Sequence, residues 1–274
     1  NGFNTAVGAR SQRNATTGEF NTSLGGLSMS AGVTTGDNNV ALGYTAGEDL
    51  TTGATNVIIG ASAGKQITTS GGNVAVGYQS LFTEDTHGTN TALGYRSLKV
   101  LNAGAFSFNT AVGYDAGVAM TTGVQNTIMG GLAGDALTTG SNNVAIGYRA
   151  LSTEDAHGRN VAIGQDALFA QNAGANGFNV AIGFETGKAI TTGIQNTMLG
   201  GLAGDAITTG MNNVAIGKSA LGAEDTGSAN VAIGAHALED QDTADFNTAV
   251  GHTSARNLTT GEFNTSLGAL SMGA

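Results

Sequence analysis

One five-residue motif recurs along the whole chain at a nearly constant spacing, and this recurrence restricts the possible folds more than any other feature. The motif has the form Asn-[Thr/Val]-x-[aliphatic]-Gly, as in residues 213–217. Successive motifs start 17 residues apart, with one step of 18 and two of 19. Self-similarity at so short a period indicates a solenoid, in which each repeat is one coil stacked on the last. The asparagines that begin the motifs, at position 0 of each coil, are Asn4, Asn21, Asn39, Asn56, Asn73, Asn90, Asn109, Asn126, Asn143, Asn160, Asn179, Asn196, Asn213, Asn230, Asn247 and Asn264.

Each motif has the pattern of a short strand. Positions 1 and 3 carry Thr or Val and then an aliphatic residue, and they alternate with small residues at positions 2 and 4. We expect positions 1 and 3 to point into the coil, and the glycine at position 4 to form a corner, because glycine reaches positive φ. The sequence therefore predicts an all-β, rod-shaped parallel β-solenoid (β-roll) of about sixteen 17-residue coils. At ~4.8 Å per coil the rod is on the order of 75 Å long.

The second half of each coil fills one interior volume from one of two positions. Some coils have Gly or Ala at position 8 and an aliphatic residue at position 11, as in Gly134 with Leu137. Others have Leu at position 8 and a polar residue at position 11, as in Leu151 with Glu154. Close packing requires that these positions compensate for one another in volume.

The asparagine at position 0 is replaced in no coil. A column of asparagines in register can form hydrogen bonds from amide to amide along the stack. Alternatively, asparagine only tolerates a turn conformation at this point. Because Asp or Gly would also serve a turn, we favour a ladder at the interior or at a corner of the coil.

Longer repeats are superimposed on the coil. Asn73, Asn143 and Asn213 lie 70 residues apart, which defines a block of four coils. The two 19-residue coils carry insertions at 102–105 and 172–175, which we expect to be loops on the same side of the solenoid. A nine-residue sequence that begins at Thr17 returns 243 residues later. We therefore expect residues 1–274 to be a single repeat array, excerpted from a longer repetitive fibre.

Composition excludes several classes of protein. The chain has 45 glycines but no proline and no cysteine, which argues against collagen and against a disulfide scaffold. Its net charge is −10 without any basic cluster, so nucleic acid is not an expected partner. No apolar run approaches the roughly 18 residues that a membrane span needs, so we expect no membrane insertion by this segment.

Residues 212–217, with the sequence Asn-Asn-Val-Ala-Ile-Gly, resemble the head repeats of trimeric autotransporter adhesins of the YadA type. That resemblance implies a left-handed parallel β-roll in which three chains lie side by side. The pattern Thr-Thr-Gly-x-x-Asn-Thr-x-x-Gly at 121–130 is equally similar to phage tail-fibre and surface-fibre shafts. The coil here is about three residues longer than the usual adhesin-head repeat.

The turns at 83–88 and 153–158 share the sequence Glu-Asp-x-His, which could offer a divalent cation three ligands. The third copy has lost its histidine, so we interpret these segments as solvated polar turns. Calcium at Glu84 and Asp85 or their equivalents remains a hypothesis, since hard cations prefer oxygen ligands. We assign no catalytic, cofactor-binding or metal residue from the sequence.

Signals for catalysis or for surface binding are weak. There is no Gly-x-Ser-x-Gly or His-Glu-x-x-His motif, and residues 60–65 only partly resemble a phosphate loop, so we read them as an ordinary coil. Repeated Thr-Thr pairs, such as 121–122 and 191–192, could bind ice or a crystalline polysaccharide. Adjacent residues in a strand point opposite ways, so a structural turn is favoured.

The sequence predicts a structural and adhesive segment of a long extracellular or cell-surface fibre, which is not an enzyme and has no cofactor. We expect a homotrimer that spaces or displays sites for a cell-surface glycan or protein receptor. The flat surface of Ala and Gly at positions 2 and 4 is the expected interface between chains, although a core within one chain would look alike. The alternatives are the shaft of a viral or phage tail fibre, located on the virion, and an ice- or glycan-binding surface.

Overall fold

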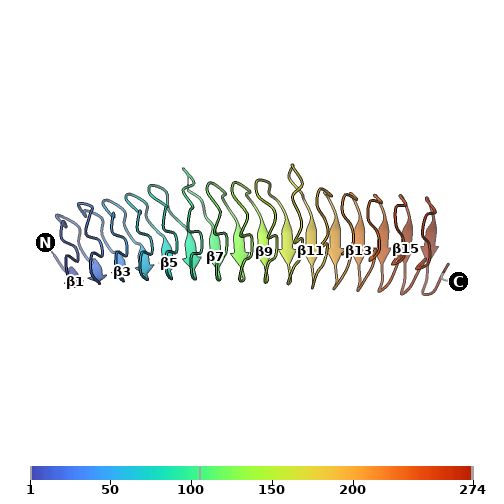
Figure 1. The fold of residues 1–274 in the computed structure, drawn as a ribbon, viewed down its shortest axis with the longest axis horizontal. Coiled ribbons are helices and arrows are strands. Elements are labelled where there is room, and N and C mark those ends of the chain that lie inside the picture. The colour runs from blue at the N-terminus through green and yellow to red at the C-terminus, as the bar shows by residue number, and fades with distance from the viewer. Residues whose placement is uncertain (1, 105, 273–274) are drawn as a thin grey trace. The chain divides into compact units, whose positions relative to one another are not determined.

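The computed structural model describes residues 2–104 and 106–272 and divides the chain into two compact units, Asn1–Gly140 and Ser141–Ala274. Each unit is a stack of coils, with one three-residue strand directly after each position-0 asparagine (Figure 1). In the first unit the strands are β1 (Thr5–Val7), β2 (Thr22–Leu24), β3 (Val40–Leu42), β4 (Val57–Ile59), β5 (Val74–Val76), β6 (Thr91–Leu93), β7 (Thr110–Val112) and β8 (Thr127–Met129). In the second unit they are β9 (Val144–Ile146), β10 (Val161–Ile163), β11 (Val180–Ile182), β12 (Thr197–Leu199), β13 (Val214–Ile216), β14 (Val231–Ile233), β15 (Thr248–Val250) and β16 (Thr265–Leu267).

Within each unit, every strand pairs in parallel with the strand of the next coil. Val57 of β4 lies beside Val74 of β5, and Val214 of β13 lies beside Val231 of β14. The N–H of Val57 donates to the carbonyl of Asn73 at 2.8 Å, so the ladder begins at the asparagine itself. The prediction of an all-β parallel β-solenoid with a 17-residue coil is confirmed. No helix in the described residues is long and apolar enough to cross a membrane.

In each unit the position-0 asparagines form a column, which we call the asparagine spine; all of them are buried except Asn4 and Asn264, which are half-buried. In the first unit, the N–H of Asn56 donates to Asn39 Oδ1 at 3.0 Å, and Asn56 Nδ2 donates to the same oxygen at 3.0 Å. Asn56 Nδ2 also donates to the carbonyl of Ser70 at 2.9 Å. The second unit repeats the pattern, with the N–H of Asn230 donating to Asn213 Oδ1 at 2.9 Å. The predicted ladder is therefore confirmed, with the backbone N–H as its recurring donor.

The turn explanation for asparagine is wrong, because the residue with positive φ is the one before it. Thr55, for example, has φ 60°, whereas no spine asparagine has positive φ. The glycine at position 4 does make the predicted corner: Gly147 has φ 134°. A Cβ on Gly147 would lie 2.5 Å from the carbonyl oxygen of Gly164 in the next coil. This position therefore needs glycine both for its φ and for the close approach of the next coil.

The inward assignment of positions 1 and 3 is wrong. In β9, Ala145 at position 2 is fully buried, whereas Val144 and Ile146 on either side of it are only half-buried. Side chains alternate between the two faces of a strand, so the buried asparagine at position 0 and the residue at position 2 share the inner face. Positions 1 and 3 must then face outward. We call these outward side chains, at the first and third residue of each strand, the strand face.

The interior is filled from positions 2, 8 and 11 together. In the coil of Asn126, Ile128 and Leu137 are fully buried and position 8 is Gly134. A Cβ on Gly134 would lie 2.7 Å from Leu137 Cδ1 and 3.4 Å from Ile128 Cδ1, so larger neighbours occupy its space. In the coil of Asn143, by contrast, position 2 is alanine and the buried Leu151 fills position 8. The predicted exchange of volume between positions 8 and 11 is confirmed, and position 2 takes part in it.

Both insertions project beyond the loops of the neighbouring coils in their own units (Figure 1). Ala105 of the first insertion lies outside the described residues. The insertions belong to different units, so their location on one common side stays a prediction.

Candidate functional site

The Glu-Asp-x-His turns contain glutamates that are fully buried. Glu84 and Glu154, at position 11 of their coils, are fully buried, and so is Glu224 in the third copy. The prediction of solvated polar turns is therefore wrong for the glutamates. It holds for Asp155, which is exposed.

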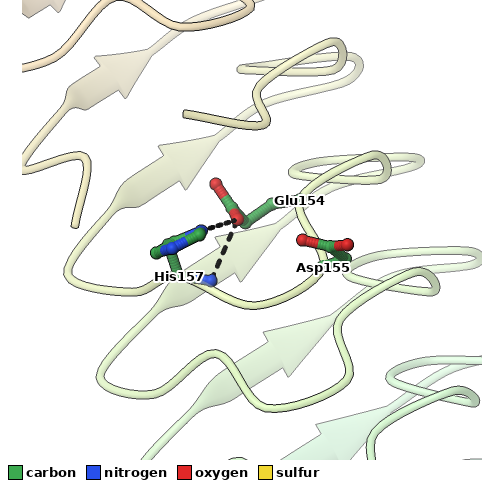
Figure 2. Close-up of side chains that lie close together, drawn as sticks. All are labelled: Glu154, Asp155 and His157. Atoms are coloured by element: carbon green, nitrogen blue, oxygen red, sulfur yellow. Dashed lines mark hydrogen bonds and ion pairs between the residues drawn. The ribbon is translucent and has the colours of Figure 1, made fainter. Parts of the chain in front are cut away.

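In the second copy, Glu154 and the histidine face one another. The N–H of His157 donates to Glu154 Oε1 at 3.0 Å, and His157 Nδ1 lies 3.5 Å from the same oxygen. Figure 2 shows these two side chains together, with Asp155 on the other side of Glu154 in this view. Glu154 Oε2 is buried and has no hydrogen-bond partner among the described residues.

Burial controls the ionisation of these carboxyl groups. It raises the pKa of Glu84 to about 7; the backbone N–H groups of His87 and Ala103 act in the opposite direction, and Asp85 adds to the rise. Burial likewise raises the pKa of Glu154, although the backbone and the ring of His157 partly offset it. Desolvation disfavours the charged form of an acid, which is the physical cause of both shifts.

Two of the buried glutamates are linked to the insertions. The N–H groups that face Glu84 and Glu154 from the following coil belong to Ala103 and Ala173, one in each insertion. The third glutamate, Glu224, precedes a coil without an insertion. Its carboxylate accepts hydrogen bonds from Gln241 Nε2 and from the N–H of Gly227 instead. Each buried carboxyl group thus accepts a hydrogen bond from a backbone N–H of its own turn, and Glu224 also accepts one from a side chain of the next coil.

One of the turns brings together a possible set of metal ligands. Glu154, Asp155 and His157 each offer one ligand atom, and these atoms lie within 4.8 Å of one another. No other group of three such residues occurs in the described part of the chain. In the equivalent first turn, His87 Nδ1 lies 2.8 Å from Thr86 Oγ1 instead. One imidazole and two carboxylates fall short of the six to eight oxygens that calcium takes, so calcium binding stays a hypothesis.

The strand face is a surface feature that recurs on every strand. Neither the first nor the third residue of any of the sixteen strands is charged. Large apolar side chains at position 3 are exposed in both units, even on strands that have a neighbour on each side: Leu93 is 44% exposed and Leu199 is 46% exposed. The exposed residues at position 3 are Val7, Leu24, Leu93, Met129, Leu199, Ile233 and Leu267.

Aromatic side chains flank the strand face. One set lies at position −1, directly before the asparagine, and another at position 5, directly after the corner glycine. Neighbouring members stack on one another: the ring centroids of Tyr95 lie 5.3 Å from those of Tyr78 and Tyr114. The exposed residues at position −1 are Phe3, Phe20, Phe108, Phe178, Phe246 and Phe263, and those at position 5 are Tyr44, Tyr78, Tyr95, Tyr114, Tyr148 and Phe184. Most of the large exposed apolar side chains therefore lie in a few regular columns.

Two other sequence features have structural roles. Residues 60–65 form an ordinary coil, in which Lys65 pairs with Glu48 at 3.3 Å and a Cβ on Gly60 would meet the backbone of the next coil. In several of the Thr-Thr pairs, the hydroxyl of the first threonine donates to the next coil, as when Thr51 Oγ1 donates to the carbonyl of Thr68 at 2.9 Å. Both features thus take part in contacts between coils, and their lack of a binding role stays a prediction.

Comparisons of the chain with protein-family models, with curated proteins and with solved structures found no match. The resemblance to adhesin heads and tail-fibre shafts therefore stays a prediction from the motifs.

Sequence reasoning missed both the buried glutamates and the strand face. A signal for the glutamates exists, since position 11 is aliphatic in other coils, for example at Leu50 and Ile67. A polar residue in a column that is otherwise apolar indicates a buried polar group. The strand face was missed because neither face of a strand carries a charge, and in β9, for example, both faces are apolar. The Ala and Gly residues at positions 2 and 4 do not form the open surface that we expected, because Ala145 is fully buried inside its own coil and Gly147 is covered by the next coil.

Proposed function

We propose that this chain is a structural and adhesive segment of a long extracellular or cell-surface fibre, in which it spaces or displays binding sites for a glycan or protein receptor. The observation that carries the proposal is the asparagine spine. Within each unit, every coil is joined to the next through buried side-chain amides as well as through the strand ladder. In a solenoid each repeat contacts only its neighbours, so length is added without changing the fold of any coil.

The proposal includes neither catalysis nor a cofactor. Covalent catalysis would need a nucleophile, its base and an orienting group within hydrogen-bond reach of one another. The chemistry of the surface is instead repetitive, which suits spacing and display.

The location is tested by immunogold electron microscopy with antibodies raised against the 274-residue chain. We expect labelled filaments on intact cells of the source organism, at the same density as on permeabilised cells. Labelling that appears only after permeabilisation would contradict an extracellular fibre. Labelling confined to virus particles would favour the tail-fibre alternative.

A further inference from the structure

All five tyrosines of the chain occupy the same place in their coils, at position 5 directly after the corner glycine. Three of them, Tyr78, Tyr95 and Tyr114, lie in consecutive coils of the first unit, and we call these three the tyrosine column. The other two, Tyr44 and Tyr148, have no tyrosine at position 5 of the coil before or after them in the sequence. The chain thus contains stacked and isolated tyrosines at equivalent positions.

The rings of the tyrosine column are stacked almost in parallel. The ring centroids of Tyr78 and Tyr95 lie 5.3 Å apart with 21° between the ring planes, and those of Tyr95 and Tyr114 lie 5.3 Å apart with 5° between the planes. The side chains leave equivalent positions of coils that rise by ~4.8 Å, so equivalent ring carbons lie next to one another. All three rings are exposed, so an oxidant in solution reaches them without any opening of the fold.

We propose that the tyrosine column is a site of oxidative cross-linking, at which hydrogen peroxide and a haem peroxidase join Tyr95 to Tyr78 or to Tyr114 through a carbon–carbon bond. The product is a dityrosine that fastens one coil covalently to the next. This site goes beyond the proposed role as a fibre segment and does not rest on it, because the chemistry needs only the stacked rings and the oxidant.

The reaction is a one-electron oxidation of each ring, followed by coupling of the two radicals. Each phenol gives one electron to the peroxidase and its hydroxyl proton to solvent, and becomes a neutral phenoxyl radical with spin density on the Cε carbons. A bond forms between one Cε of each ring. Each of these carbons then loses its hydrogen as a proton and each oxygen takes up a proton, which restores both hydroxyl groups. One hydrogen peroxide accepts the two electrons and two protons and is reduced to two water molecules.

Proximity favours coupling within the column over coupling between molecules. Radicals on Tyr78 and Tyr95 are held one coil apart, whereas radicals on two separate chains must meet by diffusion. Fixing two reacting groups side by side raises the effective concentration of one for the other far above that of the protein in solution. The net charge of −10 also makes like chains repel one another, which slows the competing reaction between them.

A cross-link in the column should also stabilise the fold. Tyr78 and Tyr95 are 17 residues apart, and Tyr95 and Tyr114 are 19 apart, so the bond closes a loop of about one coil. Closing such a loop reduces the conformational freedom of the unfolded chain more than that of the folded chain. The cross-linked chain should therefore unfold at a higher urea concentration than the untreated chain.

The test treats the 274-residue chain with a haem peroxidase and hydrogen peroxide at several low protein concentrations. Dityrosine fluorescence measures the yield, a denaturing gel shows whether links lie within or between chains, and mass spectrometry of digests identifies the linked peptides by the loss of two hydrogen atoms. Tyr95→Phe keeps a stacked ring but removes the partner that both pairs share. Tyr148→Phe removes an isolated tyrosine and is the matched control. Ala61→Tyr, at an exposed position 5, fills the gap between Tyr44 and Tyr78.

We expect the unmodified chain and Tyr148→Phe to form dityrosine within single chains, with a yield per chain that does not change with protein concentration. Tyr95→Phe should lower the yield about tenfold or more, because no tyrosine then has a tyrosine neighbour in the column. Adding Ala61→Tyr to Tyr95→Phe should restore the yield, in peptides that contain positions 44, 61 and 78. This double variant keeps the test valid, since a second substitution would not restore a yield lost through a damaged fold.

Each other outcome overturns the inference. Equal yields from Tyr95→Phe and the unmodified chain would show that the column is not the site. Links formed mainly between chains would overturn coupling within the column, and so would a failure of Ala61→Tyr to restore the yield. No dityrosine in the unmodified chain, under conditions that couple free tyrosine, would overturn the site itself. The immunogold experiment decides the fibre role independently of all these results.

Discussion

Asn39 Oδ1 accepts two hydrogen bonds from Asn56 in the next coil, one from its backbone N–H and one from its Nδ2, each 3.0 Å long. One side-chain oxygen thus satisfies a buried backbone donor and a buried amide at once. Asn56 repeats the arrangement toward Asn73, whose N–H donates to Asn56 Oδ1 at 3.0 Å. Buried polar groups without a partner are costly, so this chain of bonds stabilises each coil against its neighbours.

Asn56→Ala should lower the free energy of unfolding by about 3 kcal/mol. The substitution removes the bonds made by Nδ2 and leaves the N–H of Asn73 buried without an acceptor. Urea unfolding followed by circular dichroism measures the change. Asn102→Ala is the control, because Asn102 is exposed and should change stability by no more than about 0.5 kcal/mol. Equal effects of the two substitutions would contradict a stabilising spine.

Gly147→Ala should be far more damaging than Gly174→Ala. Both glycines have positive φ, at 134° and 67°. A Cβ on Gly147 would lie 2.5 Å from a carbonyl oxygen of the next coil, whereas a Cβ on Gly174 would have no atom within 4 Å. We expect a loss of more than about 3 kcal/mol for Gly147→Ala and about 1 kcal/mol for Gly174→Ala. Thermal melting of both variants checks the difference, and similar melting temperatures would refute the close approach of the coils.

Ala145→Asp and Ile146→Asp test which side of the strand faces inward. Ala145 is fully buried, so the aspartate would place an unpaired charge in the interior and cost about 4 kcal/mol or more. Ile146 faces outward, so its replacement should cost only about 1 kcal/mol within a single chain. Urea unfolding of both variants at low protein concentration makes the comparison. A larger loss for Ile146→Asp would restore the inward assignment of position 3.

Glu84 should make the solenoid more stable in mild acid than at neutral pH. Its pKa is raised from 4.5 to about 7 on folding, so the folded state holds the proton more tightly than the unfolded state. The stabilisation is fully present below pH 4.5 and is lost as the pH rises to about 7, a change of about 3 kcal/mol.

Glu84→Gln should remove this pH dependence, because glutamine stays neutral. The free energy of unfolding is measured in urea between pH 4.5 and 8 for the variant and for the unmodified chain. As the pH rises, the value for the variant should increase relative to the value for the unmodified chain. Glu19→Gln, at an exposed glutamate, is the control and should run parallel to the unmodified chain. A parallel profile for Glu84→Gln as well would show that Glu84 is not buried in the folded state.

The coil, its strand and its corner could be predicted because each depends on a few neighbouring residues. The 17-residue period indicates that one coil stacks on the next. The glycine at position 4 indicates a corner whose φ other residues avoid. The spine follows from an asparagine that recurs in register, as between Asn213 and Asn230. The buried Glu84 was mistaken for a surface residue because its acidic neighbours suggested a solvated turn. Only its place in the apolar column of position 11 shows otherwise.

The sequence by itself determined the period, the strands and the spine of this protein, because these arise from local alternation and from identical residues in register. Only the tertiary structure decided which face of each strand is buried. Alternation defines two faces, but here both are apolar: Ala145 on one side, Val144 and Ile146 on the other. The closed coil has a narrow interior, already occupied by the spine and by Leu151 or its equivalents. That space admits alanine, so the larger valine and isoleucine face outward.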